Sequence, residues 1–334
     1  MKEKILKLLR ETEGYVSGQQ LCETLGVSRT AVWKHIRQLQ EEGYGIEAVT
    51  RKGYRLTGVP DTVAASAVSS LLQTRWAGHP VRYYSVTDST NQVAKRLGDE
   101  GDPEGTLVIA DEQTAGKGRS GRRWATPPGT NIAMTLLLRP KLQADRISMV
   151  TLVMGMAVAQ AVRKLYGLEA TVKWPNDVVI GTKKLSGTLT EMSAELDGSS
   201  LSRTKVHYIV IGTGINVNML DFLEEIRETA TSLRLELGRT ADRAQLIAEI
   251  MKCFEEDYAV FLESGDMSGL REEFEELMVN TGRQVTVLEP GHEYTGTALG
   301  INDRGELRVR TGDGSVREVY AGEVSVRGIY GSYV

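Results

Sequence analysis

The sequence predicts a multi-domain α+β protein in which a small helical head precedes a larger mixed body and a short all-β tail. Amphipathic helical patterns fill the first 57 residues, strand and helix patterns mix from residue 81, and short strands follow Gly282. The 334 residues exceed the ~250–300 at which single cores usually divide. We therefore expect a head at 1–60, a linker with a short helix at 61–80, a body at 81–279 and a tail at 280–334.

The composition is typical of a globular protein, with 41% hydrophobic and 25% charged residues. No run approaches the ~20 apolar residues that span a bilayer, and the N-terminus lacks the apolar core of a signal peptide. Cys22 and Cys253 stand far apart in sequence, which argues against a Cys-x-x-Cys site and a disulfide framework. We expect a cytoplasmic protein with no membrane partner.

The net charge of −4 is unevenly distributed. Residues 1–57 hold ten Lys/Arg and seven Asp/Glu, a balance of +3, which leaves 30 Lys/Arg and 37 Asp/Glu, or −7, for the rest. A basic head on an acidic body suggests that the head has a polyanionic partner.

The head has the pattern of three short helices. Apolar residues within 5–9 give the first helix. Ser17 and Gln20 form a capping-box start for the second, and Ser28 is a good N-cap for a third helix from Arg29 to about Glu42. This spacing predicts a helix-turn-helix.

The third helix has two different faces. Its apolar face contains Val32, Ile36 and Leu39, and the opposite face is polar and basic. Such a helix suits the major groove of DNA. A hairpin with Arg51-Lys52-Gly53 at its tip follows, which completes a winged helix-turn-helix.

We expect the head to bind DNA, and to do so as a dimer, because one head offers too few contacts for a specific site. The alternative is a three-helix domain whose charges merely keep it soluble. The residues expected at base edges are Thr30, Trp33, Lys34 and Arg37. Those expected at phosphates are Ser17, Ser28, Arg29 and Lys52.

In the body, strands are expected at 81–86, 106–113, 131–139, 170–174, 185–192 and 207–212. Helices are expected at 64–72, 147–165, 240–262 and 269–278. This order indicates an α+β body on a mixed or antiparallel sheet. The tail should form a five-stranded small barrel with strands at 284–288, 294–300, 306–310, 316–320 and 323–326.

Three polar, glycine-rich segments interrupt the body. The first, Asp88–Gln92, follows a strand and begins a helix, and by itself is explained by ordinary N-cap preferences. The second, Gln113–Trp124, holds four cations and three glycines, which suits a loop that wraps phosphate. It does not fit a Walker A loop, and a basic surface loop is the alternative.

The third segment is Lys173–Asp177, followed by Gly181–Gly187. Pro175 and Gly181 mark the ends of a hairpin, and Lys184 opens a strand from which its ammonium could point into a site. Gly212–Asn216 resembles half of a dinucleotide fingerprint but lacks the third glycine and the βαβ setting, so we do not interpret it as a Rossmann motif.

No Ser-His-Asp or Cys-His set can be assembled, because the four histidines, at 35, 79, 207 and 292, stand apart from these segments. If the chain is an enzyme, positioning and electrostatics must carry its chemistry.

Together, the motifs Ser89-Thr-Asn91, Gly116-Lys-Gly-Arg119, Lys173-Trp-Pro-Asn-Asp177, Lys184-Leu-Ser-Gly187 and Gly214-Ile-Asn216 resemble those of the biotin–protein ligase family. With the winged helix ahead and an SH3-like barrel behind, the chain resembles the members of that family that also repress biotin operons. The resemblance implies ligation of biotin with ATP and Mg²⁺ through biotinyl-5′-AMP, and transfer of biotin to a lysine of the biotin carboxyl carrier protein. It also implies that biotinyl-5′-AMP is the corepressor, and that a homodimer binds operator DNA.

The resemblance also implies residue roles. The catalytic residues would be Arg119 and Lys184. The biotin-binding set would be Ser89, Thr90, Asn91, Gln113, Lys117, Gly118, Arg119, Trp124 and Lys184. The ATP- and adenylate-binding set would be Arg122, Arg123, Lys173, Asn176, Asp177, Gly214 and Asn216, with Mg²⁺ near Asn176 and Asp177.

One position departs from the family pattern. The loop usually reads Gly-Arg-Gly-Arg, whereas this chain has Lys117 at the first basic position. Lysine lacks the planar fork of arginine, so a bidentate contact there is in doubt.

Two other functions are considered: a lipoate–protein ligase, whose substrate tail is purely apolar, and a ligand-sensing transcription factor without ligase activity. The polar residues Ser89–Asn91 and Gln113 favour the ureido ring of biotin over lipoate.

Overall fold

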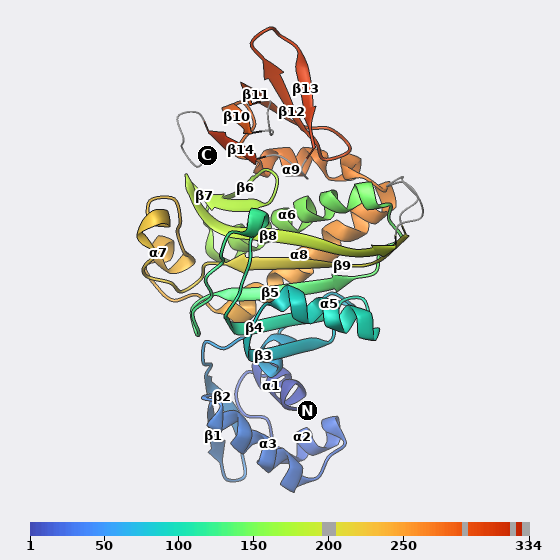
Figure 1. Ribbon diagram of the computed structural model, residues 1–334. Coiled ribbons are helices and arrows are strands. Elements are labelled where there is room, and N and C mark those ends of the chain that lie inside the picture. Colours follow the sequence, from blue (N-terminus) through green and yellow to red (C-terminus); the bar gives the residue numbers. More distant parts are fainter. Residues whose placement is uncertain (196–204, 289–292, 321–324, 329–334) are drawn as a thin grey trace.

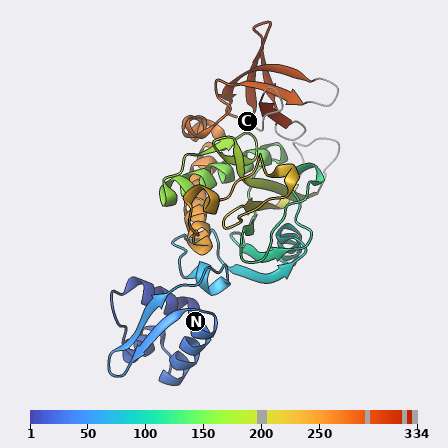
Figure 2. The same ribbon diagram turned by 90° about the vertical axis from the view of Figure 1, so that its left-hand side faces the viewer.

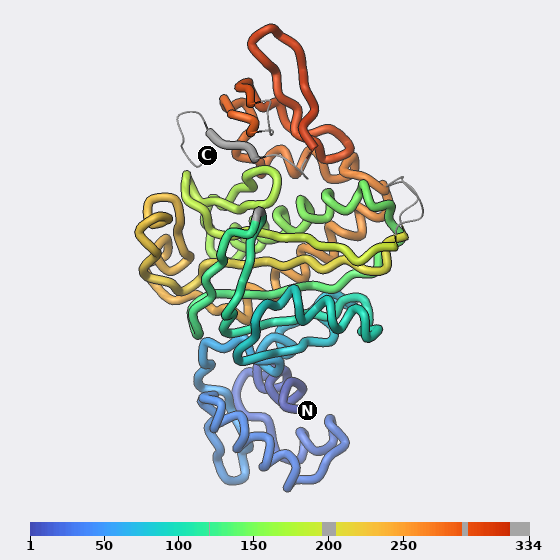
Figure 3. The backbone as a smooth tube through the Cα atoms, in the orientation of Figure 1, coloured from blue at the N-terminus to red at the C-terminus, as the bar shows by residue number. Residues whose placement is uncertain are grey.

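The computed structural model shows a helical head, a central body and a C-terminal sheet that follow one another along the molecule (Figure 1, Figure 2). It describes residues 1–195, 205–288, 293–320 and 325–328. The chain starts in the head and reaches the C-terminal sheet at the opposite end (Figure 3). The predicted order of a helical head, a mixed body and an all-β tail is confirmed.

The head contains three helices, α1 (Lys2–Glu11), α2 (Gly18–Leu25) and α3 (Arg29–Glu41), and a hairpin of β1 (Gly45–Val49) and β2 (Gly53–Gly58). The hydroxyl of Ser17 accepts a hydrogen bond from the Gln20 amide, and that of Ser28 accepts one from Ala31. Both predicted N-caps are therefore confirmed.

The wing is held against the start of α2. Val16 pairs with Tyr54 through two backbone hydrogen bonds of 2.9 Å. Gly53 has a φ of +114°, and a Cβ there would lie 2.1 Å from the Val16 carbonyl oxygen. Glycine is required at this turn, because any side chain would push the wing off the helical core.

The body is built on a seven-stranded sheet in the order β3-β4-β5-β9-β8-β7-β6. β3 and β4 are parallel, and every other neighbouring pair is antiparallel, so the sheet is mixed. The strands are β3 (Val81–Thr87), β4 (Leu107–Gln113), β5 (Ile132–Leu138), β6 (Ala170–Lys173), β7 (Asp177–Ile180), β8 (Lys183–Glu195) and β9 (Lys205–Ile215).

Helices cover both faces of this sheet. α6 (Ile147–Tyr166) and α8 (Arg243–Ser264) pack against each other on one face, and α5 (Thr90–Glu100) lies on the other (Figure 1, Figure 2). The remaining body helices are α4 (Ala65–Ser69), α7 (Leu233–Leu237) and α9 (Arg271–Leu277). Short 3-10 turns occur at Arg119–Gly121, Ala144–Arg146, Glu224–Ile226 and Met267–Gly269.

One expectation about apolar runs was wrong. The segment Ala144–Tyr166 is long and apolar enough, by length and composition, to cross a membrane. However, 72% of its most apolar window is buried inside the protein. This burial against the sheet and α8 identifies α6 as the core helix of the body.

Several elements differ from the predictions, β7, α8 and β9 among them. β7 was missed, since Pro175 and Gly181 lie in two successive turns around this four-residue strand rather than at the ends of one hairpin. α8 starts at Arg243, because the side chain of Asp242 caps it by accepting from the Gln245 amide. β9 continues to Ile215 between β5 and β8, which confirms that its glycines are not in a βαβ unit.

The tail forms a five-stranded antiparallel sheet in the order β13-β12-β11-β10-β14. Its strands are β10 (Gln284–Leu288), β11 (Tyr294–Ile301), β12 (Leu307–Thr311), β13 (Val316–Val319) and β14 (Ser325–Gly328). A hydrogen bond joins the body to the C-terminal sheet: the indole Nε1 of Trp174 donates to the Gly305 carbonyl at 3.0 Å. The predicted strand Glu323–Val326 begins outside the described residues.

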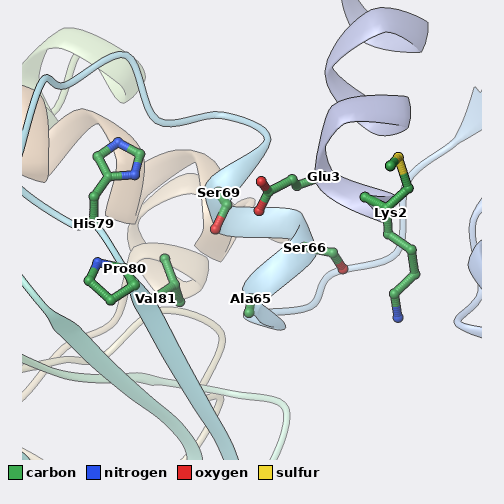
Figure 4. A pocket seen from close by; sticks show the side chains of 9 residues that line it. Lys2, Glu3, Ala65, Ser66, Ser69, His79, Pro80 and Val81 are labelled. Carbon is green, nitrogen blue, oxygen red and sulfur yellow. The ribbon is translucent and has the colours of Figure 1, made fainter. Parts of the chain in front are cut away.

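The segment that joins head and body is packed rather than loose. The Glu255 carboxylate on α8 accepts from the backbone amides of Arg75, Trp76 and Ala77. α4 contacts α1, α8 and β3. A cavity of about 620 Å³ remains between head and body (Figure 4). Its lining residues are Met1, Lys2, Glu3, Ala65, Ser66, Ser69, His79, Pro80 and Val81.

Candidate functional site

The predicted site segments meet at the end of the sheet nearest α7, on the left in Figure 1. β4 and β9 end there, β8 begins there, and the turn between β6 and β7 lies beside them. The start of α5 and the glycine-rich loop at 114–131 complete this region. Segments more than 100 residues apart in sequence therefore contribute to one site.

The polar floor of this site is formed by α5 and β4. The Oε1 atom of Gln113 accepts from the backbone amide of Thr90 at 2.9 Å. The Oγ1 atom of Thr90 lies 3.1 Å from the same Gln113 oxygen. The Nε2 atom of Gln113 donates to Thr126 at 3.2 Å. Ser89 occupies the N-cap position of α5, yet its side chain makes no capping hydrogen bond. The expectation that this segment is ordinary capping therefore fails for Ser89.

The glycine-rich loop folds back on itself. Lys117 pairs with Arg123 in a short bridge, and the Gly118 amide donates to the Arg122 carbonyl at 2.7 Å. The side chains of Lys117, Arg122 and Arg123 are exposed, whereas Arg119 is half-buried. Of the four cations in this loop, Arg119 alone is partly buried, and the other three side chains are exposed to solvent.

Trp124 closes the loop over β9. A Cβ at Gly214 would lie 2.3 Å from the indole ring, so glycine is needed for this approach. The indole Nε1 is buried and has no hydrogen-bond partner among the described residues. A buried, unsatisfied donor is costly, so this N–H is available to a ligand.

Two cations lie next to the β6–β7 turn. The Lys184 ammonium is 2.5 Å from Oδ1 of Asp177 and 5.7 Å from the centroid of the Trp124 ring. Nη1 of Arg119 donates to Oδ1 of Asn176 at 3.1 Å. Sequence positions 119, 124, 177 and 184 thus form one charged corner above the polar floor.

The electrostatics of this corner are governed by burial. Burial lowers the pKa of Arg119, the nearby Asp177 carboxylate raises it, and the Arg122 charge lowers it. An arginine with fewer water contacts is a stronger partner for an incoming anion, because the local dielectric is low. The corner can therefore hold an anion between Arg119 and Lys184.

The other residues predicted to bind nucleotide surround this corner. Lys173 is 5% exposed and pairs in register with Asp177. Gly214 lies on β9 beneath Trp124, and Asn216 follows that strand, with its Oδ1 3.4 Å from Nδ2 of Asn131. These residues lie at the same sheet end, while Arg122 and Arg123 line its exposed rim.

Sequence reasoning missed the groups that support the site. Thr135 is fully buried in β5 and lies 2.7 Å from Oδ1 of Asn91. Arg243 is 1% exposed and pairs with Asp61 and Asp111, which lies two residues before Gln113. The one available signal was a threonine inside the otherwise apolar strand at 132–138.

The head presents the predicted DNA-facing surface. Thr30, Trp33, Lys34 and Arg37 are exposed on α3, with Trp33 53% exposed and the Arg37 guanidinium 5.1 Å from its ring. Arg29 and Lys52 are exposed as well. The oxygens of Ser17 and Ser28 accept from amides, which leaves their hydroxyl protons for phosphate.

Comparison with known proteins assigns all three parts. The model of the Biotin/lipoate A/B protein ligase family matches residues 83–216, an HTH domain model matches 2–55, and the Biotin protein ligase C terminal domain model matches 281–327. The bifunctional ligase/repressor BirA of Bacillus subtilis is 38% identical over 93% of this chain and 94% of that protein. Its Escherichia coli namesake is 32% identical over 97% and 96% of the two chains.

A solved structure is also similar. The biotin protein ligase of Aquifex aeolicus in complex with biotin and ATP has a TM-score of 0.63 and 30% sequence identity, and covers 74% of this chain and 98% of that chain. The chain therefore belongs to the biotin/lipoate protein ligase family, among the bifunctional ligase/repressors that carry a helix-turn-helix domain ahead of the ligase.

Proposed function

We propose that this chain joins biotin to ATP, giving biotinyl-5′-AMP, and then transfers the biotinyl group to a lysine of a biotin carboxyl carrier protein. The observation that carries this proposal is that the charged corner of Arg119 and Lys184 lies at the same end of the sheet as the polar floor of Thr90 and Gln113. The relatives named as biotin ligases, and the structure with biotin and ATP, support the choice of substrates.

In the first step, a carboxylate oxygen of biotin attacks the α-phosphorus of ATP, and pyrophosphate leaves with the bonding electrons. Both reacting groups are anions, so their repulsion must be offset before they can approach. We assign this neutralisation to Lys184 and Arg119, and half-burial supports it, because charges interact more strongly where water is partly excluded. We assign these two as the catalytic residues.

In the second step, the neutral amine of the carrier lysine attacks the acyl carbon, and AMP leaves. The products are an amide and AMP, and the lysine loses one proton to solvent. The same two cations would stabilise the departing phosphate of AMP. No covalent enzyme intermediate is required.

Recognition of the ureido ring of biotin is assigned to the polar floor. Ser89, Thr90 and Gln113 supply hydroxyl and amide groups, and Trp124 supplies an apolar wall with a free indole N–H. Asn91 supports the floor from below. Lys117 and Gly118 close the pocket rim, where Lys117 is exposed and would act as a point charge.

ATP is assigned to the sheet end near the β6–β7 turn, with contacts from Arg122, Arg123, Lys173, Asn176, Asp177, Gly214 and Asn216. The described residues contain no cluster of three or more His, Cys, Asp or Glu that could hold a metal. Asp177 suits a magnesium ion that the triphosphate brings with it, since such ions need one or two carboxylates. That ion would shield the charge of the departing pyrophosphate.

We further propose that the chain represses biotin genes as a homodimer in the cytoplasm, with biotinyl-5′-AMP as corepressor. The exposed basic face of α3 and the names of the relatives support operator binding. A dimer supplies the two heads that two half-sites require.

Isotope exchange between pyrophosphate and ATP tests the ligase. Exchange that depends on biotin, and does not occur with lipoate, supports the proposal. Exchange with lipoate instead would support a lipoate ligase, and no exchange with either would support a ligand-sensing regulator without ligase activity.

Operator binding is tested with a duplex selected from a random pool by the full chain. Its affinity should rise when biotin and ATP are present together, and Arg37→Ala should lower that affinity about tenfold or more without changing exchange. An affinity for the operator duplex that does not change when biotin and ATP are added would contradict the corepressor role.

A further inference from the structure

A continuous line of hydrogen bonds runs beneath the polar floor. The Lys95 ammonium lies 2.5 Å from Oε1 of Glu191 on β8, and Nδ2 of Asn91 donates to the other oxygen at 2.8 Å. Oγ1 of Thr135 lies 2.7 Å from Oδ1 of Asn91 and 2.8 Å from Oγ1 of Thr90. The line thus connects the edge of α5 to the floor.

The orientation of the Asn91 amide is forced. Its Nδ2 faces two groups that can only accept, a Glu191 carboxylate oxygen and the Leu189 carbonyl at 3.3 Å. Oδ1 must therefore face Thr135. A Cβ at Gly212 would lie 2.0 Å from Oδ1 of Asn91, so the amide fits here only because residue 212 is glycine.

This orientation determines where the hydroxyl protons point. Oδ1 of Asn91 can only accept, so the single hydroxyl proton of Thr135 is directed to it. Thr135 has one hydroxyl proton and cannot donate it to Asn91 and Thr90 at once. With that proton on Asn91, the 2.8 Å contact between the two hydroxyls requires the proton of Thr90.

Gln113 is satisfied without that proton. Its Oε1 already accepts the Thr90 backbone amide at 2.9 Å, which is shorter than the 3.1 Å to the Thr90 hydroxyl. With its proton directed to Thr135, the Thr90 hydroxyl offers lone pairs on its remaining side. It can accept there, but it cannot donate.

We propose that Glu191 and Thr135 are positioning residues that turn the Thr90 hydroxyl into an acceptor for a ureido N–H of biotin. This inference rests on the proposed function, because it concerns how that pocket selects its substrate. A ureido ring carries two N–H donors, whereas the dithiolane ring of lipoate has none. The hydrogen-bond line would therefore favour the ureido substrate.

Replacing Thr135 with valine tests this directly, because valine keeps the shape and removes the hydroxyl. The Thr90 hydroxyl then loses its 2.8 Å partner, so its proton is no longer fixed away from the pocket, where it would oppose the substrate N–H. We expect the dissociation constant of biotin, measured by calorimetry without ATP, to rise at least about tenfold. The kcat of exchange at saturating biotin should change less than about threefold, and Thr135→Ser should restore biotin affinity.

Two further variants separate polarity from stability. Thr151→Val removes a part-buried threonine pair with Thr190 between α6 and β8, and should leave biotin affinity unchanged. Glu191→Leu removes the acceptor from a half-exposed position, and should weaken biotin binding by several-fold even if Thr135→Val does not fold. Glu195→Leu, on the same strand, is its control.

The outcomes are distinguishable. A wild-type chain that neither binds biotin nor supports biotin-dependent exchange would overturn the proposed function. An active wild-type chain with unchanged biotin affinity in Thr135→Val would overturn this inference alone. Equal losses in Thr135→Val and Thr135→Ser would also overturn it, because they would show a packing effect rather than a hydrogen-bond direction.

Discussion

The ammonium of Lys184 lies 2.5 Å from the Asp177 carboxylate and 5.7 Å from the centroid of the Trp124 ring, so one group from the start of β7 and one from the glycine-rich loop hold it in place. In this position it faces the site rather than bulk solvent. The ion pair holds it in this orientation before any substrate arrives, which is how preorganised electrostatic catalysis works.

Replacing Lys184 with methionine should therefore reduce biotinyl-5′-AMP formation by ~10²–10³ at saturating substrates, the usual cost of one such contact. Single-turnover formation of the adenylate measures this. Lys183→Met, at the exposed neighbouring position, is the matched control and should retain the wild-type rate. A loss of less than about threefold in Lys184→Met would remove it from the catalytic pair.

Gly214→Ala should displace Trp124, because the new Cβ would lie 2.3 Å from the indole. We expect weaker biotin binding by about tenfold and a loss of ~1–3 kcal/mol in the free energy of unfolding, as for other overpacked positions. Titration calorimetry and urea unfolding measure the two effects. Gly312→Ala adds a Cβ in open space and should change neither. Unchanged biotin affinity in Gly214→Ala would show that Trp124 does not line the pocket.

Arg243→Met should destabilise the protein strongly. The guanidinium is 2% exposed and joins Asp61 of the linker to Asp111 of β4 at 3.0 and 2.8 Å. Without it, two half-buried carboxylates lose their cation, which typically lowers the free energy of unfolding by ~3 kcal/mol. Urea unfolding measures this. Arg271→Met, which breaks an exposed pair with Asp303, should cost under ~1 kcal/mol. Equal effects of the two variants would contradict a structural role for the buried pair.

The free energy of unfolding should depend on pH through Asp257. Burial among α6, α8 and α9 raises its pKa to about 7, with further contributions from the charges of Glu273 and Glu256 and an opposing hydrogen bond from Gln160. The unfolded carboxyl has a pKa near ~4. Between pH ~4 and ~7 the native state binds more protons than the unfolded state, so this group lowers stability as the pH rises.

Asp257→Asn should abolish that loss. Its free energy of unfolding should vary less between pH 5 and pH 8, and at pH 8 the variant should be more stable by up to ~4 kcal/mol. Urea unfolding at the two pH values measures the difference. A wild-type stability that rises across this range, with no gain in the variant at pH 8, would contradict a raised pKa.

Much of the fold was predictable because its patterns are local. The caps at Ser17 and Ser28, the apolar back of α3 and the long α6 follow from short-range periodicity. β7 was missed because four residues between two turns carry too little periodicity to be separated from a hairpin. The start of α8 was misplaced because two polar residues, Thr240 and Asp242, compete as caps.

The site was predictable where chemistry requires unusual residues. The loop at 116–123 gathers four cations of like charge among three glycines, and this unusual composition marks a functional segment in the sequence itself. Thr135 and Arg243 were missed because a threonine in a strand and an arginine at a helix start are ordinary in sequence. Their roles depend on tertiary contacts with Asn91 and Asp61, which no local pattern encodes.

The most direct test of the ligase assignment is the exchange of labelled pyrophosphate into ATP by the full chain, measured with biotin, with lipoate and with neither. We expect exchange with biotin alone, and its loss in Lys184→Met. Exchange that needs lipoate, or none with either acid in a folded chain, would contradict the account of this site as a biotin-activating centre.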